Sequence, residues 1–121
     1  MSVKAFLKSI RYALRGTGSL WRSEQNFRIQ VLAGVIVLVL MTLLPLETWE
    51  RILLLLLVAS VLVLEAINSV IERLVDVLKS RIHPSVRDMK DIMAATVLFA
   101  SVLAAVIGAM ILLPRVWTLL V

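Results

Sequence analysis

The sequence contains no cysteine and only one histidine among its 121 residues. These absences exclude disulfide bonds and thiolate metal sites, so any metal site must use mainly oxygen ligands. Glycine is scarce as well, with four residues in the chain, which leaves little material for the glycine-rich loops that cradle phosphate groups. The GxxxxGK[ST] pattern, a strand-linked GxGxxG pattern and the motifs of soluble protein kinases are also missing. The sequence therefore lacks the common motifs for nucleotide binding.

Apolar residues, in contrast, are in excess. They make up 61% of the chain, with a mean hydropathy of +1.02, whereas a soluble domain is about 45–50% apolar. They form three blocks, at residues 31–46, 52–64 and 92–113. A helix that spans a bilayer needs roughly 20 mainly apolar residues, which these blocks supply with their apolar flanks. We therefore predict an all-α integral membrane protein with a single domain over residues 1–121 and transmembrane helices over 27–46, 49–78 and 90–114.

The first 25 residues predict a helix of a different kind. At about 100° per residue, their apolar and basic side chains fall on opposite faces, as in an amphipathic helix that lies in the membrane interface. We expect Gly16 and Gly18 to bend or break this helix. Lys and Arg are concentrated in residues 1–30 and 73–90, and loops rich in these residues stay in the cytoplasm. We therefore predict a cytoplasmic N-terminus, a cytoplasmic 73–90 segment and an external C-terminus.

Polar residues interrupt the second apolar segment at helical spacing. On a helical wheel they fall within one stripe about 80° wide; they are Glu65, Asn68, Glu72 and Asp76. A charged group in a spanning helix costs several kcal/mol unless it faces a partner or water. The stripe favours a functional site, and the alternative is that these side chains only bond neighbouring helices to one another.

Other charged residues are expected in the same membrane layer. Glu24 precedes the first span, and Lys90 and Asp91 begin the third. Carboxylates suit Mg²⁺, which proteins hold through one or two carboxylates together with substrate phosphates, and a lysine can bind phosphate as a point charge. Glu65 lies deeper, at the level of a lipid headgroup hydroxyl, where it could act as a general base. Composition and spacing alone thus predict a cytoplasm-facing carboxylate site in a membrane, and they do not identify ATP.

The polar stripe also carries a resemblance. With its motif Glu65-Ala-Ile-Asn-Ser-Val-Ile-Glu72, continued by Asp76, His83-Pro84 and Lys90-Asp91, the chain resembles the prokaryotic diacylglycerol kinase family, which includes the undecaprenol kinases. The similarity runs over about residues 6–114, with Tyr12 and Glu24 in register. The chain departs from the family pattern at Gln30, where an acid or a histidine is frequent, and at Ala94, where a small polar residue is frequent.

The resemblance implies a lipid kinase of the bacterial cytoplasmic (inner) membrane that transfers the γ-phosphate of MgATP to diacylglycerol to give phosphatidate. Undecaprenol is the alternative acceptor. A homotrimer with composite sites between protomers is implied, and no nucleic-acid partner. Glu65 resembles the general base and Asn68 a second catalytic residue, while Glu24 and Glu72 resemble Mg²⁺ ligands. The nucleotide-binding positions of the family match Tyr12, Glu24, Glu72, Asp76, His83, Lys90 and Asp91.

Two alternative functions, which are not enzymatic, are also compatible with the sequence. A small ion-coupled transporter could use Glu65 as its carrier site, and a structural membrane protein could use the stripe only to oligomerise. A transporter places its acids near the bilayer midplane with access from both sides. The acids here gather at the cytoplasmic end of the predicted spans, which favours an enzyme.

Overall fold

The computed structural model describes residues 2–78 and 84–121, and this part of the chain is entirely helical. Four helices follow one another in the order α1 (Val3–Ser23), α2 (Gln25–Leu43), α3 (Thr48–Leu78) and α4 (Pro84–Leu120). The last three are long and apolar enough to cross a membrane, which confirms the predicted class. His83, a predicted site residue, lies outside the described residues.

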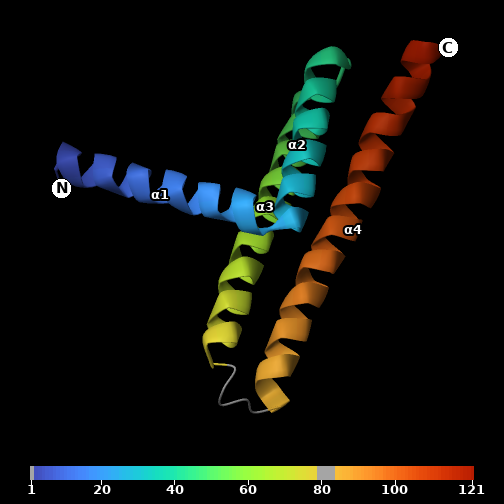
Figure 1. Ribbon diagram of the computed structural model, residues 1–121. Coiled ribbons are helices and arrows are strands. Elements are labelled where there is room, and N and C mark those ends of the chain that lie inside the picture. The colour runs from blue at the N-terminus through green and yellow to red at the C-terminus, as the bar shows by residue number, and fades with distance from the viewer. Residues whose placement is uncertain (1, 79–83) are drawn as a thin grey trace.

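Helix α1 leaves the other three helices at a steep angle (Figure 1). It buries no residue, as expected for an amphipathic helix whose apolar face lies in the membrane interface. The expectation that Gly16 and Gly18 would bend or break it is wrong, because the helix continues through both positions without a positive φ. A glycine inside a helix costs only about 1 kcal/mol relative to alanine, which neighbouring residues can offset.

The chain turns sharply at Glu24, between α1 and α2. This residue is extended, with φ −116° and ψ 107°, and its N–H still donates to the Leu20 carbonyl at 2.9 Å. Arg28 stabilises the turn, because its Nη1 donates to the last carbonyls of α1, those of Trp21 at 2.6 Å and Arg22 at 3.2 Å. A cation at the end of a helix satisfies carbonyls that have no partner within the helix. The turn places the Glu24 carboxylate beside the bundle instead of along α1.

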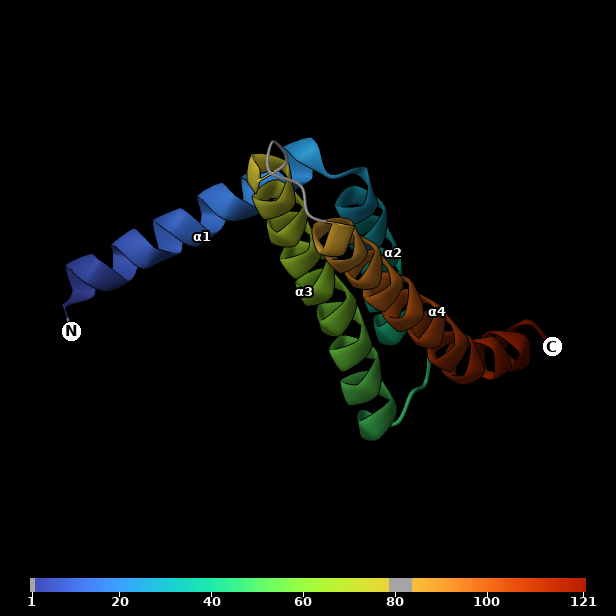
Figure 2. The same cartoon turned by 90° about the horizontal axis from the view of Figure 1, so that it is seen from below.

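Helices α2, α3 and α4 run side by side, and α3 packs against both of the others (Figures 1 and 2). Many of their large apolar side chains are exposed, as in helices surrounded by lipid. Helix α2 approaches α3 closely at the buried Gly34, where an added Cβ would lie 2.9 Å from Val58 Cγ1. Helix α4 is longer than expected at both ends and contains Pro114, which spanning helices tolerate.

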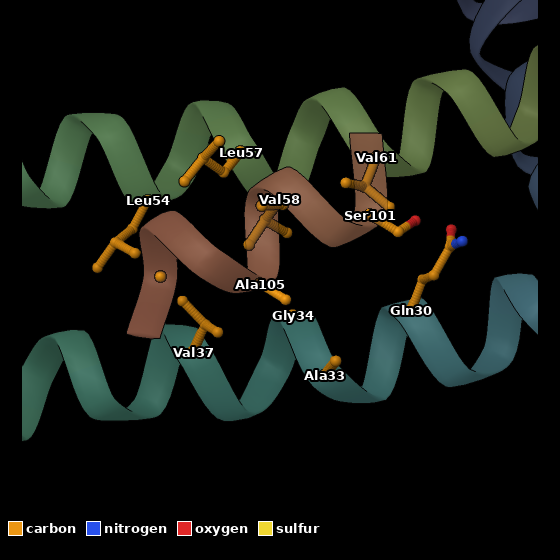
Figure 3. A pocket seen from close by; sticks show the side chains of 12 residues that line it. Gln30, Ala33, Gly34, Val37, Leu54, Leu57, Val58, Val61, Ser101 and Ala105 are labelled. Atoms are coloured by element: carbon orange, nitrogen blue, oxygen red, sulfur yellow. The ribbon is translucent and has the colours of Figure 1, made fainter. Parts of the chain in front are cut away.

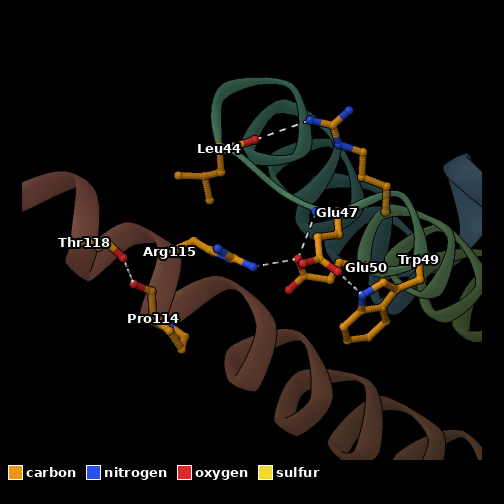
Figure 4. A network of polar contacts seen from close by, with 8 residues as sticks. Leu44, Glu47, Trp49, Glu50, Pro114, Arg115 and Thr118 are labelled. Atoms are coloured by element: carbon orange, nitrogen blue, oxygen red, sulfur yellow. Dashed lines mark hydrogen bonds and ion pairs between the residues drawn. The ribbon is translucent and has the colours of Figure 1, made fainter.

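An ion pair with a buried carboxylate closes the end of the bundle at the α2–α3 turn (Figure 4). Glu50 is 5% exposed, and its Oε1 accepts from Arg115 Nη2 at 3.0 Å and from the Glu47 N–H at 2.9 Å. An apolar cluster packs beside it, with Leu54 only 2% exposed and Ile111 contributed by α4. The pair therefore holds the end of α4 against the turn, and sequence spacing gave no indication of this contact.

Candidate functional site

The polar stripe of α3 lines a groove between α2, α3 and α4. Glu65 is 1% exposed, Asn68 is buried and Glu72 is half-buried. The groove has a volume of about 440 Å³, and the other helices contribute both polar and apolar side chains. Its lining includes Asn26, Ile29 and Gln30 from α2 and Ala94, Val97, Leu98 and Ser101 from α4. Three predicted site residues, Glu65, Asn68 and Glu72, thus share one opening, which we call the carboxylate groove.

Side-chain hydrogen bonds fix the orientation of these groups. Asn68 Nδ2 donates to Glu72 Oε1 at 3.1 Å, and Gln30 Nε2 donates to Glu65 Oε2 at 3.4 Å. Three buried oxygens, Glu65 Oε1, Asn68 Oδ1 and Gln30 Oε1, have no hydrogen-bond partner among the described residues. Leaving such a group unpaired costs about 1–3 kcal/mol, and each one calls for an explanation. Their position in one groove indicates that a ligand satisfies them.

Glu24 approaches the same site from the junction of α1 and α2. Its Oε1 accepts from Ser69 Oγ at 2.9 Å, and Ser69 is completely buried. Arg73 strengthens this junction, because it donates to Ser19 and to Ser23 near the end of α1, the latter at 2.7 Å. Helix α3 therefore holds the end of α1 in place and fixes the position of the Glu24 carboxylate.

Two further carboxylates, those of Glu24 and Glu72, act electrostatically on Glu65. Both Glu24 and Glu72 lie close enough to repel the charge of Glu65, and like charges at one site attract a cation. The described residues contain no cluster of three or more acidic or histidine side chains arranged around one metal position. Two carboxylates are, however, the usual protein share of a Mg²⁺ site, since substrate phosphates and water supply the other oxygens. Glu24 and Glu72 fit this donor set.

Asp76 and Lys90 meet one turn of α3 beyond Glu72. Lys90 Nζ lies 3.7 Å from Asp76 Oδ1, and the two side chains are 43% and 63% exposed. Helices α3 and α4 continue here past the level of α1 (Figure 1). Asp91 is exposed and does not line the carboxylate groove. Lys90 and Asp76 do not line the groove either, but each lies one helical turn from a residue that does, Ala94 and Glu72, and the partly exposed lysine is accessible to an anionic ligand.

Tyr12 is not brought to this groove. It lies on α1, three turns before Glu24 and thus roughly 18 Å away along the helix, and it is 54% exposed. Lys8 Nζ and the Arg15 guanidinium carbon each lie 5.9 Å from the centre of its ring. Cations at this distance attract an aromatic face. The structure therefore does not bring Tyr12 to the carboxylate groove of the same chain.

A second, apolar groove adjoins the first. Its volume is about 210 Å³, and small residues such as Gly34, Ala104 and Gly108 contribute to its wall. Gln30 and Ser101 line both grooves, and Figure 3 shows their polar ends at one end of the apolar groove. Neither residue was predicted to line the site, since Gln30 was noted only as a departure from the family pattern. Ser101 is an isolated polar residue in an apolar span, and this pattern could have indicated a site residue.

Comparison with known proteins agrees with this arrangement. The sequence profile of the family "Prokaryotic diacylglycerol kinase" matches residues 11–112. An undecaprenol kinase of Bacillus subtilis (strain 168) is 34% identical over 110 residues, covering 91% of this chain and 89% of that protein. A diacylglycerol kinase of Synechocystis is 34% identical over 116 residues, covering 95% of this chain and 66% of that protein. A diacylglycerol kinase of Escherichia coli (strain K12) is 30% identical over 106 residues, covering 88% of this chain and 87% of that protein.

Proposed function

Since the chain belongs to the prokaryotic diacylglycerol kinase family of membrane lipid kinases, we propose that it phosphorylates diacylglycerol with ATP to give phosphatidate. Relatives of similar identity are named diacylglycerol kinase and undecaprenol kinase. Undecaprenol, which would give undecaprenyl phosphate, is therefore the alternative acceptor. Either acceptor is a membrane lipid with one reactive hydroxyl, so the chemistry at the site is the same.

The observation that carries the proposal is the buried Glu65 carboxylate with an unpaired Oε1 in the carboxylate groove. Glu65 lies one turn, roughly 6 Å, deeper than Ser69, which contacts the junction of α1 with α2. If α1 lies in the interface, Glu65 reaches the depth of a lipid hydroxyl. The adjoining apolar groove then offers a place for hydrocarbon. A soluble substrate would need neither feature.

Phosphoryl transfer at this site requires few groups. Glu65 Oε1 accepts the hydroxyl proton while the lipid oxygen bonds to the γ-phosphorus; the bond from that phosphorus to the β–γ bridging oxygen breaks, and ADP leaves. Gln30 keeps Glu65 oriented through its bond to Oε2. Asn68 fixes Glu72 through the bond to its Oε1. Positioning and charge neutralisation supply most of the catalysis in such reactions.

We assign the nucleotide to the mouth of the carboxylate groove. Glu24 and Glu72 would hold Mg²⁺, which neutralises the phosphate charge during transfer. We place the Lys90–Asp76 pair beside this mouth, one turn beyond Glu72, where Lys90 would contact phosphate. Tyr12, Asp91 and His83 stay assigned to the nucleotide by family resemblance. Since Tyr12 is exposed and does not line its own groove, we expect it to serve the site of a neighbouring protomer in a homotrimer.

The orientation of the chain follows from the same assignment. ATP is cytoplasmic, so the mouth of the groove must face the cytoplasm. This agrees with the basic residues of 1–30 and 73–90 under the positive-inside rule. The Glu50–Arg115 pair then lies at the external end of the bundle.

The proposal is tested by phosphate transfer from labelled ATP with the purified protein in lipid–detergent micelles. Diacylglycerol and undecaprenol are offered separately, and the lipid products are identified. We expect labelled phosphatidate, with a higher kcat/KM for diacylglycerol than for undecaprenol. A higher value for undecaprenol would transfer the assignment to the alternative acceptor. If phosphate is transferred to neither lipid, the kinase assignment is contradicted, and a transporter or a structural membrane protein is favoured.

A further inference from the structure

Two uncharged polar residues mark the boundary between the carboxylate groove and the apolar groove. Gln30 from α2 and Ser101 from α4 line both. Figure 3 shows their polar ends at the same end of the apolar groove, beyond which the labelled side chains are apolar. The mechanism above uses only one N–H of the Gln30 amide, the one that reaches Glu65. The remaining donor groups at this boundary have no assigned purpose.

The boundary carries hydrogen-bond donors beside one buried acceptor, Gln30 Oε1, which has no partner among the described residues. The Gln30 amide has a second N–H, and Ser101 has a hydroxyl. Thr96 on the same helix donates its hydroxyl to the carbonyl four residues earlier, that of Ile92, at 2.9 Å. No such bond is formed by Ser101 within the described residues. Neither residue is charged, so the pair suits a neutral acceptor such as an ester carbonyl better than a phosphate.

The order of groups along the bundle matches the order of groups in an acylglycerol. Glu65, at one side of the boundary, would take the hydroxyl proton, and Gln30 lies 3.4 Å from it. From Ser101 the apolar groove continues along α4 to Gly108, a rise of roughly 10 Å. In diacylglycerol an ester carbonyl lies a few bonds from the free hydroxyl, between that hydroxyl and a hydrocarbon chain. A polyprenol has no oxygen other than its hydroxyl.

We propose that Gln30 and Ser101 form a subsite that donates hydrogen bonds to an ester carbonyl of the acceptor lipid and so favours acylglycerols over polyprenols. The inference rests on the proposed function and deepens it, because it names the part of the acceptor that is recognised. Gln30 also bonds to Glu65, so its substitution would change catalysis as well as lipid binding. Substitution of Ser101 tests recognition of the ester carbonyl alone.

The experiment uses the full chain in mixed micelles with a dialkylglycerol, the ether analogue of diacylglycerol. This lipid keeps the hydroxyl and both chains and lacks the two carbonyls. We expect the wild type to show a KM for the ester lipid that is about 2- to 10-fold lower than for the ether lipid, the value of one neutral hydrogen bond. Ser101→Ala should raise the KM for the ester lipid to that for the ether lipid, with kcat and the KM for ATP unchanged. Ser101→Thr keeps the hydroxyl and should restore the lower KM for the ester lipid.

Ser60→Ala is the matched control, because Ser60 is an exposed serine in the apolar part of α3; it should leave every constant unchanged. Equal KM values of the wild type for ester and ether lipids would overturn the subsite. The same conclusion follows if Ser101→Ala raises both values by the same factor. Transfer to undecaprenol alone would overturn the subsite and leave the kinase in place, whereas absence of transfer to any lipid would refute the proposed function itself.

Discussion

The contact of α2 with α3 at Gly34 allows a prediction with an internal control. In Gly34→Ala the new Cβ would lie 2.9 Å from Val58 Cγ1, closer than carbon atoms pack, whereas in Gly108→Ala it would meet no atom within 4 Å. Both glycines lie inside spanning helices and neither has a positive φ. The gain in helix propensity, about 1 kcal/mol, is therefore the same for both variants and cancels when they are compared.

The clash at Gly34 has no easy relief. Val58 is β-branched, and such side chains have one strongly preferred rotamer in a helix, so the helices themselves must move apart. Overpacking of this kind costs about 1–3 kcal/mol. We therefore expect Gly34→Ala to be less stable than Gly108→Ala by about 1–3 kcal/mol. Gln30 lies one turn from Gly34 on α2, so a displaced helix would also lengthen the 3.4 Å contact with Glu65 and reduce activity.

The assay is unfolding of the purified protein in mixed micelles, followed by the helical signal in circular dichroism. Val58→Ala removes the methyl group that the new Cβ would meet, so the double variant Gly34→Ala/Val58→Ala should recover stability relative to the sum of the single changes. Equal stability of Gly34→Ala and Gly108→Ala, or strict additivity in the double variant, would refute the packing argument.

Two further predictions concern the two ends of the bundle. Glu24→Gln and Glu72→Gln should each raise the Mg²⁺ concentration for half-maximal kinase rate by about tenfold or more, and an unchanged titration would contradict their assignment as ligands. Arg115→Ala should lower the free energy of unfolding by about 1–3 kcal/mol, between the values for buried and exposed pairs. The reason is that the side chain of Arg115 is 37% exposed and that of Glu50 only 7%. Arg11→Ala, at an exposed position of α1, should leave stability unchanged, and an equal loss in both variants would show that the ion pair contributes nothing.

The parts of the molecule that local sequence determines could be predicted. Hydropathy over about 20 residues identifies a spanning helix, and spacing of three or four residues brings Glu65, Asn68 and Glu72 to one face. These features need no knowledge of how the helices meet, and the structure has the three spans and one groove lined by these three side chains.

Contacts between distant segments could not be predicted in the same way. Ser69 bonds to Glu24 across 45 residues and Arg115 to Glu50 across 65. The first depends on the sharp turn at Glu24, whereas the sequence suggested a bend at Gly16 or Gly18 that does not occur. Glycine permits a bend without requiring one, and the observed turn is instead stabilised by the bond from Arg28 to the last carbonyls of α1.

We propose Glu65 as the base for transfer of phosphate to a lipid hydroxyl, and its amide variant tests this role. The most direct measurement is the rate of labelled phosphatidate formation by Glu65→Gln under saturating lipid and MgATP, beside the exposed control Glu47→Gln. Size-exclusion chromatography and circular dichroism check that the assembly and its helices are intact. We expect Glu65→Gln to lose rate by a factor on the order of 10² or more and the control to lose none. A Glu65→Gln rate within a few-fold of the wild type would contradict this role.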